Sequence, residues 1–162
     1  NTTMATKYPK LLTLDVNHFH KSPRVRVSLM PQRYSNILEP KMQNIESRIR
    51  DVNRLKDLGW EVHLNYSPLV FHNDWLELYE ELFVLVKDIA GENKCEVIAL
   101  TNHHRQMMKA SPEARELMKH SCEVKNKSGI MRYPINYKSI WIKNWKKAYS
   151  KYFNLKTIRY IF

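Results

Sequence analysis

The chain has 162 residues, of which 27 are Lys or Arg and 16 are Asp or Glu, and its formal net charge is +11. No apolar run approaches the roughly 18 to 20 residues that a membrane-spanning helix needs, and no cleavable signal segment stands near the N-terminus, so we expect a soluble, cytoplasmic protein. Only two cysteines are present, Cys95 and Cys122, which excludes a disulfide framework and a paired-cysteine metal knuckle.

Up to about residue 120, strand-like segments alternate with helix-like segments. The strand-like segments are 24–30, 60–66 and 94–100, and Pro31 and Ser67-Pro68 are expected to end or turn the first two. The helix-like segments repeat apolar residues every three or four positions and run from Asn44 to Gly59, from Asp74 to Gly91 and onward from Ser111. This order predicts parallel βα units, too few to close a barrel, and hence an α/β sheet with one edge open at its N-terminal side.

Residues 121–162 differ from the rest in charge and in pattern. From Val124 to Phe162 there are ten Lys or Arg and no Asp or Glu, so this segment carries nearly all of the net charge of +11. Its pattern predicts two short strands at 122–125 and 129–133 around a turn, a helix capped by Asn136 or Ser139, and a final strand at 157–162. We therefore divide the chain into a sheet unit, residues 1–120, and a small basic α+β extension, residues 121–162.

The localised positive charge favours a polyanionic partner, because neutralised phosphates release counterions. Aromatic residues lie between the basic ones and are able to stack on bases, although several of them must belong to the core. A solvated basic helix face is the alternative interpretation.

Several segments, taken in series from about residue 5 to the last residue, carry a family resemblance. They are Lys7 with Leu11–Asp15, then Arg24–Pro31, Leu38–Pro40, Arg48–Gly59, Leu64–Trp75, Val97–His103, Arg132-Tyr133 and Ile158–Phe162. In order and spacing these segments resemble the spore photoproduct lyase family of radical-SAM proteins, and in particular its non-sporulating, DNA repair photolyase-like members.

This resemblance implies that the chain is the C-terminal half of a partial (β/α)₆ radical-SAM barrel with parallel strands, followed by the basic extension. It also implies a lyase that repairs thymine-dimer lesions in DNA with a 5′-deoxyadenosyl radical, made from S-adenosylmethionine at a [4Fe-4S] cluster. Such a cluster needs a CxxxCxxC run, which Cys95 and Cys122 do not form. We therefore expect the cluster ligands upstream of Asn1, in a missing N-terminal half of the same protein.

The resemblance further implies four residues that bind S-adenosylmethionine: Lys7, Ser28, Asn65 and Ser67. Ser28, Asn65 and Ser67 stand at the ends of expected strands, where barrels of this kind present their active sites, whereas Lys7 lies near the N-terminus. Lys7 is expected to pair with the carboxylate of the cofactor. Each of three residues also has an alternative interpretation without a cofactor. Ser28 would simply end a strand, Lys7 would be an ordinary surface lysine, and Asn65 would hydrogen-bond to the backbone of a turn.

For DNA, the expected hairpin is the first candidate and the basic helix from Lys143 to Lys151 is the second. In the hairpin, Lys125, Lys127 and Arg132 are positioned to grip phosphates while Tyr133 wedges beside a lesion. We predict no metal site at the histidines, because their pairs lack partner pairs at ligand spacing.

Two rival functions remain open at this stage. The absence of the cysteine run favours a non-catalytic nucleic-acid-binding module or an inactive remnant, whereas the serial match along the chain favours the enzyme. A different radical-SAM substrate is also compatible, because a fold transfers chemistry better than it transfers substrate.

Overall fold

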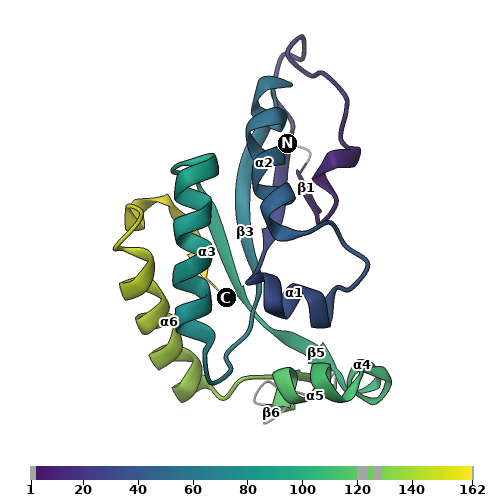
Figure 1. The fold of residues 1–162 in the computed structure, drawn as a ribbon, viewed down its shortest axis with the longest axis vertical. Coiled ribbons are helices and arrows are strands. Elements are labelled where there is room, and N and C mark those ends of the chain that lie inside the picture. Colours follow the sequence, from purple (N-terminus) through teal and green to yellow (C-terminus); the bar gives the residue numbers. More distant parts are fainter. Residues whose placement is uncertain (1–2, 120–123, 126–128, 162) are drawn as a thin grey trace.

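The computed structural model of the chain describes residues 3–119, 124–125 and 129–161 (Figure 1). Its main element is a five-stranded parallel sheet in the order β1-β2-β3-β4-β8. The strands are β1 (Thr3–Thr6), β2 (Arg24–Leu29), β3 (Glu61–Leu69), β4 (Cys95–Ala99) and β8 (Ile158–Ile161). The predicted α/β class with parallel strands is confirmed, and the N-terminal edge of the sheet is formed by β1, a strand that sequence analysis did not predict.

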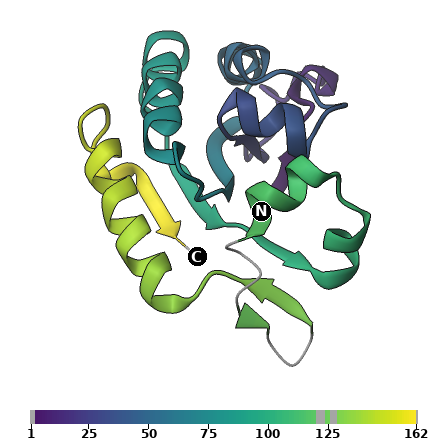
Figure 2. The same cartoon turned by 60° about the horizontal axis from the view of Figure 1, so that its bottom comes forward.

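Three long helices cover one face of this sheet, which we call the outer face: α2 (Ile45–Asp57), α3 (Trp75–Ala90) and α6 (Ile135–Tyr149). Figure 2, which brings the carboxyl ends of the strands forward, shows them in a row along one side of the strands. The shorter helices are α1 (Gln32–Leu38), α4 (His104–Lys109) and α5 (Pro112–Met118), with 3-10 turns η1 (Pro9–Leu11) and η3 (Leu155–Thr157). None of the helices in the described ranges combines the length and apolarity that a bilayer crossing requires.

Two of the four predicted N-terminal helix caps are present in the structure. The Asn44 side chain accepts a hydrogen bond from Ser47 N–H, and the Ser111 side chain accepts one from Ala114 N–H. Asp74 precedes α3 but does not cap it, because its carboxylate is turned toward Tyr34, whose hydroxyl donates to it at 3.1 Å. The expected start of α6 at Asn136 or Ser139 is wrong: the helix begins at Ile135, directly after Pro134.

Two glycines end the long helices in backbone conformations that favour glycine. Gly59 has φ +86° and follows α2, and Gly91 has φ +66° and follows α3. At Gly59 the space is also restricted, since a Cβ would lie 2.8 Å from the backbone nitrogen of Asn17. The α2–β3 turn is therefore fixed both by its own backbone and by the loop that crosses it.

The expected end of the second strand at Ser67-Pro68 is wrong, because β3 continues to Leu69. The strand accommodates Pro68 by a shift in its pairing with β4 between Tyr66 and Leu69. A strand can tolerate proline where the ladder is irregular, since proline has no N–H to donate. β3 thereby carries its carboxyl end toward a second, smaller sheet.

That second sheet is antiparallel, in the order β5-β7-β6, with β5 at Thr101–His103, β7 at Ile130–Arg132 and β6 at Val124–Lys125. The predicted pairing of the two tail strands is confirmed, whereas the strand at 101–103 was not predicted. The main sheet runs across the boundary that we predict at residue 120, because β8 pairs in parallel with β4. Helix α6 and strand β8 thus add one more unit to the same sheet.

Aromatic rings fill the space between the outer face and the helices. Trp145 and Tyr149 of α6 are fully buried and stack at 4.9 Å between ring centroids. Tyr66 of β3 and Phe83 of α3 both lie against Trp145, at 5.4 and 5.3 Å. These contacts account for the aromatic residues of the basic tail that sequence analysis assigned to the core.

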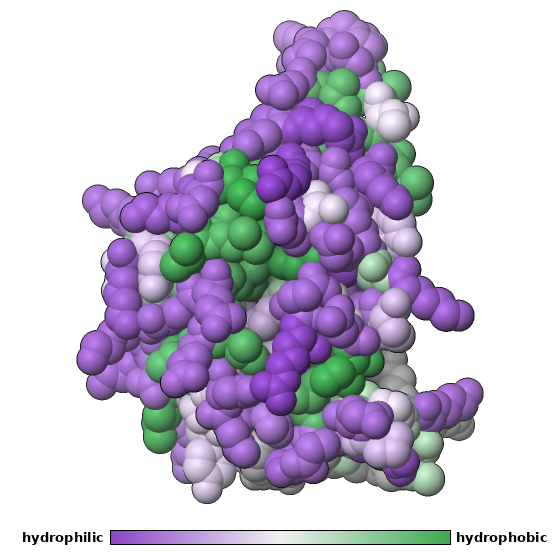
Figure 3. Space-filling model, in the orientation of Figure 1, coloured by the Kyte–Doolittle hydropathy of each residue, from purple (hydrophilic) through white to green (hydrophobic). Residues whose placement is uncertain are grey.

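The surface over the helices is largely polar and carries several apolar areas, the most extended of them between α2 and α3 (Figure 3). A groove of about 440 Å³ lies there, lined in part by Ile45, Leu78 and Leu85. This groove opens on the outer face, next to the segment that follows β2 and the start of α2.

Candidate functional site

Three of the four predicted cofactor residues converge at the carboxyl ends of adjacent strands. Lys7 directly follows β1, and Ser28 of β2 is in register with Asn65 of β3. Ser28 and Asn65 are 4 % and 5 % exposed, and Asn65 Nδ2 donates to Ser28 Oγ at 3.5 Å. The parallel register brings together a cation, a hydroxyl and an amide that stand far apart in the sequence.

The side chains of Ser28 and Asn65 point away from the three long helices. Because successive side chains of a strand alternate between faces, and Tyr66 packs against α6, its neighbour Asn65 lies on the opposite, inner face. The Oδ1 atom of Asn65 is buried and has no hydrogen-bond partner among the described residues. An unpaired buried acceptor is costly, so a donor supplied by a bound molecule would be stabilised there.

A cavity of about 320 Å³ lies beside this cluster and is lined by Lys7 and Ser28 together with Ala5, Thr6, Tyr8 and Met42. A second cavity of about 470 Å³ shares Lys7 and extends along α1 and α5 to Thr101. Ser67, the fourth predicted residue, is half-buried and precedes Pro68, which lines this second cavity. Lys7 therefore stands where the two cavities meet.

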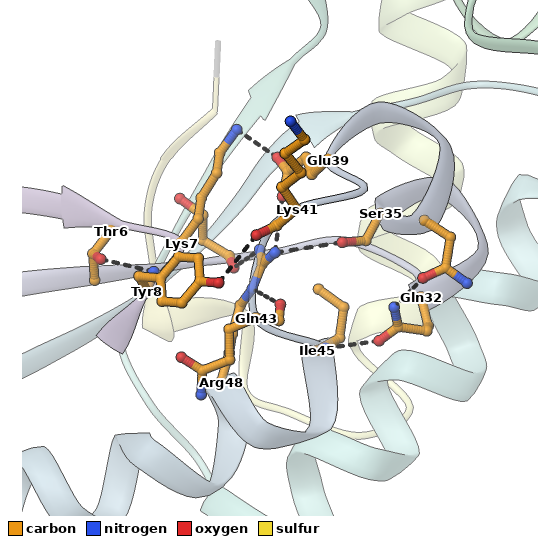
Figure 4. A network of polar contacts seen from close by, with 12 residues as sticks. Thr6, Lys7, Tyr8, Gln32, Ser35, Glu39, Lys41, Gln43, Ile45 and Arg48 are labelled. Carbon is orange, nitrogen blue, oxygen red and sulfur yellow. Dashed lines mark hydrogen bonds and ion pairs between the residues drawn. The ribbon is translucent and has the colours of Figure 1, made fainter. Parts of the chain in front are cut away.

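The position of Lys7 is set by a buried ion network (Figure 4). Its Nζ lies 2.5 Å from Glu39 Oε1, and the other carboxylate oxygen of Glu39 accepts from Arg48 Nη2 at 3.0 Å. Arg48 is 0 % exposed and also donates to the carbonyl oxygens of Gln43 and Ser28, at 2.6 and 3.1 Å. One guanidinium thus ties the end of β2 to the segment that carries Glu39.

Sequence analysis did not single out Glu39 or Arg48 as site residues. Arg48 lies on the buried face of α2 with Ile45, Ile49 and Val52, all of them apolar. A charged residue within an apolar helical stripe is the signal that was available, since a fully buried Arg requires a partner.

A second polar network covers the inner face nearer the amino ends of the strands. Arg26 Nη1 donates to Glu96 Oε2 at 2.9 Å, and Arg159 Nη1 lies 3.7 Å from the other oxygen of Glu96. Burial raises the pKa of Glu96, but hydrogen bonds from Tyr160 and Arg26 outweigh it and hold the pKa below its usual range. This network joins β2, β4 and β8 across the sheet.

His63 belongs to the same face and is 1 % exposed. Its Nε2 lies 2.9 Å from Glu61 Oε1, and its Nδ1 lies 3.3 Å from Arg159 Nη1. A neutral ring with the proton on Nε2 satisfies both partners, since Nδ1 then accepts from the guanidinium. Burial lowers the pKa of His63, in keeping with a neutral imidazole.

The predicted DNA residues occupy different environments. Arg132 is exposed at the end of β7, and Lys125 lies in β6 opposite Met131. Lys127 falls outside the described residues. Tyr133 is 2 % exposed, and its hydroxyl accepts a hydrogen bond from Phe71 N–H at 3.1 Å. In this conformation Tyr133 anchors the hairpin to the loop after β3 and does not reach the surface.

The described residues do not offer ligands for an iron–sulfur cluster. Burial raises the pKa of the Cys95 thiol to about 11, so it is not a thiolate at neutral pH, and its Sγ lies 3.4 Å from the Tyr149 hydroxyl. Cys122 is outside the described residues. Within the part of the chain that the structure describes, no three His, Cys, Asp or Glu side chains are grouped to hold a metal ion.

The fold, a parallel sheet covered by helices on one face and polar on the other, is that of part of an α/β barrel. Solved structures of spore photoproduct lyase have the same fold. A Tyr-to-Phe variant gives a TM-score of 0.77 at 18 % identity, and a Cys-to-Ser variant gives 0.74 at 18 %, each match covering 98 % of this chain and 49 % of that chain. A further variant, with bound AdoMet and dinucleoside spore photoproduct, gives 0.64 at 15 % identity.

The chain therefore spans about half the length of the solved structures it matches. No protein-family model matches the sequence, and no curated protein matches it. At these identities the likeness establishes the fold.

Proposed function

We propose that this chain is the C-terminal half of a spore photoproduct lyase-like radical-SAM protein that repairs thymine-dimer lesions in DNA. The observation that carries the proposal is the convergence of Lys7, Ser28 and Asn65 beside a cavity at the carboxyl ends of parallel strands. One structure with this fold contains bound AdoMet, and others contain dinucleoside spore photoproduct.

The cluster has the chemistry to hold the amino-acid part of S-adenosylmethionine. Lys7 offers a cation to the carboxylate, in exchange for or shared with its pairing to Glu39. The free Oδ1 of Asn65 is an acceptor for an ammonium or hydroxyl group, and the Ser28 hydroxyl borders the same cavity. When bound with a [4Fe-4S] cluster, the cofactor supplies a 5′-deoxyadenosyl radical; the residues of this chain bind and orient it.

The [4Fe-4S] cluster does not fit the residues of this chain. The sequence contains no CxxxCxxC run, and Cys95 is a buried thiol. In the proposal its ligands belong to an N-terminal half, which would pair with the inner face and the β1 edge. The chain alone would then hold only part of the cofactor site.

DNA would be held by the hairpin, with Arg132, Lys125 and Lys127 on phosphates. Tyr133 would position the hairpin through its bond to Phe71. A non-catalytic nucleic-acid-binding module is the second candidate, favoured by ten cations and no acids between Val124 and Phe162.

Cofactor binding by the chain is tested by calorimetric titration with S-adenosylmethionine and with 5′-methylthioadenosine, which lacks the amino-acid part. Lys7→Ala should weaken S-adenosylmethionine binding about 10- to 150-fold, the value of a charge-assisted hydrogen bond, and leave 5′-methylthioadenosine unchanged. An equal loss for both ligands would contradict the role given to Lys7. If Ser28→Ala, Asn65→Leu and Lys7→Ala all bind S-adenosylmethionine as tightly as the unmodified chain does, the proposed cofactor site is refuted.

A further inference from the structure

A stack of aromatic rings runs from the core to the surface at the start of α6. The rings of Phe71, Trp141 and Tyr137 follow one another, with centroids 4.6 Å apart at 30° and 5.6 Å apart at 22°. Phe71 is buried, whereas Tyr137 at the outer end is 52 % exposed. The stack therefore ends in an aromatic ring with open surface.

The sequence makes Tyr137 the first member of a regular series. Aromatic residues recur every fourth position at Tyr137, Trp141, Trp145 and Tyr149, which places them on one stripe of α6, and Phe153 continues the spacing beyond the end of the helix. Trp145, Tyr149 and Phe153 are buried in the core. Packing on both faces explains these later rings, whereas Tyr137 packs on Trp141 and leaves about half of its surface open.

We propose that this exposed end of the stack is a subsite where an unpaired base of a DNA strand stacks on Tyr137, with the adjoining phosphates held by Arg132 and Lys138. The inference rests on the proposed binding of DNA and extends it beyond the lesion pocket. Bases stack on aromatic side chains with little regard to sequence, so the subsite would hold the strand without selecting its bases.

A small cavity next to the stack supplies polar groups for a base edge. It measures about 210 Å³ and is lined by Phe71, His72, Asn73, Trp75 and Trp141. The Nε2 atom of His72 is buried without a hydrogen-bond partner in the described part of the chain, its nearest carboxylate oxygen, in Glu116, being 3.8 Å away. An aromatic wall beside a ring nitrogen that makes no close hydrogen bond suits a flat heterocycle with polar edges.

Two cations lie near the exposed end of the stack, whereas the carboxylates of Asp74 and Glu116 lie beside His72 at its inner end. Arg132 is exposed, and Lys138 is half-buried in the first turn of α6. Burial lowers the pKa of Lys138, and the charge of Arg132 lowers it further, so the two cations act on each other. The segment that carries both cations, from Val124 to Phe162, contains no Asp or Glu. A phosphate between them would relieve this repulsion.

The subsite is joined to the hairpin rather than remote from it. The Tyr133 ring lies 4.9 Å from Phe71 and 5.3 Å from Trp141, so the base of the hairpin and the stack form one packed unit. Figure 2 shows the start of α6 and the hairpin at the same end of the molecule. A DNA strand bound to the hairpin would therefore be close enough to reach the aromatic stack.

The test uses fluorescence anisotropy with the 162-residue chain and a labelled oligothymidylate of about 10 nucleotides, within the usual site size of single-strand binders. A second oligomer of equal length and charge carries abasic sugars. Tyr137→Ala should weaken oligothymidylate binding about 5- to 150-fold and leave the abasic oligomer unchanged, while Tyr137→Phe keeps the parent affinity. Phe19→Ala, another exposed aromatic residue, is the matched control.

Two further variants separate the subsite from DNA binding in general. Arg132→Ala and Lys138→Ala should each reduce the slope of log affinity against log salt by about one, on both oligomers. If these variants weaken binding but Tyr137→Ala does not, DNA binding stands and the stacking subsite falls; the exposed Ile135 and Ile140 beside Tyr137 would then fit a protein partner better. If the parent chain binds neither oligomer, the subsite and the DNA-binding part of the proposed function both fall.

Discussion

The Arg48 guanidinium and the Glu39 carboxylate form an ion pair at 3.0 Å in the interior, between α2 and the segment that follows α1. Neither side chain is more than 5 % exposed. Through Glu39 the pair holds Lys7, and through the Ser28 carbonyl it holds the end of β2, so it fixes two of the residues assigned to the cofactor.

Removing Arg48 should therefore leave a buried negative charge without its partner. We expect Arg48→Ala to lower the free energy of unfolding by about 3–5 kcal/mol, measured by urea denaturation. Arg50→Ala is the matched control: Arg50 pairs with Glu46 on the exposed side of the same helix, and its loss should cost no more than about 0.5 kcal/mol. Similar losses in the two variants would contradict the network.

The two helix-ending glycines should differ in their tolerance of alanine. Gly91→Ala meets no atom within 4 Å, so its cost is that of the unfavourable backbone conformation, about 1–3 kcal/mol. Gly59→Ala has a similar conformational cost and also places a Cβ 2.8 Å from the Asn17 backbone, which adds about 1–3 kcal/mol of overpacking. Thermal or urea unfolding of both variants should rank Gly59→Ala as clearly the less stable, and the reverse order would refute the crossing geometry.

Acid should destabilise the protein through His63. Because burial lowers its pKa in the folded state, the unfolded chain binds the proton first as the pH falls below about 6.5. Stability due to this group is thus complete above that pH and is lost progressively below it. His63→Gln should flatten the decrease in unfolding free energy between about pH 6.5 and 5. His20→Gln, at an exposed position, is the control, and a profile unchanged in His63→Gln would exclude this role.

Glu61 and Arg159 also set the pKa of His63, because they face its two ring nitrogens. Arg24 also faces the pair through Glu61. Replacing Arg159 by Met should raise the pKa of His63 by removing a cation beside Nδ1, and a histidine titration by NMR would record the shift.

Tyr133 should behave as an anchor. Tyr133→Phe leaves the Phe71 N–H without its acceptor in a buried place, and we expect a loss of about 1–3 kcal/mol in unfolding free energy. Tyr137→Phe removes an exposed hydroxyl and should change stability by less than about 0.5 kcal/mol. A fully stable Tyr133→Phe variant with weakened DNA binding would instead favour the wedge role.

The sequence predicted most of the sheet because apolar patterning and caps are local signals. Asn44, Ser111 and the two glycines mark helix ends through their own backbone chemistry, and the structure has them where expected. Pro68 was misleading, because only the pairing with β4 shows that the strand continues past it. The start of α6 at Ile135 was missed for a similar reason, since polar residues at 136 and 139 matched a cap better than Pro134 did.

Site residues were predictable to a lesser degree. Ser28 and Asn65 belong to strands that the sequence predicted, and parallel pairing brings them together, whereas the strand before Lys7 was not predicted and places that residue beside them only through its pairing with β2. Glu39 and Arg48 depend on tertiary packing between α1, α2 and β2, which no local pattern contains. The burial of Tyr133 likewise depends on Phe71, 62 positions away in the chain.

The central claim, that this chain is half of a radical-SAM enzyme, is tested most directly by expressing the reading frame extended upstream of Asn1 under anaerobic conditions. The extended protein, reduced and supplied with S-adenosylmethionine, should contain a CxxxCxxC run and release 5′-deoxyadenosine, and Lys7→Ala should reduce that release. An extended frame without the cysteine run, or an iron-loaded protein that releases no 5′-deoxyadenosine, would contradict the account and leave the nucleic-acid-binding module in its place.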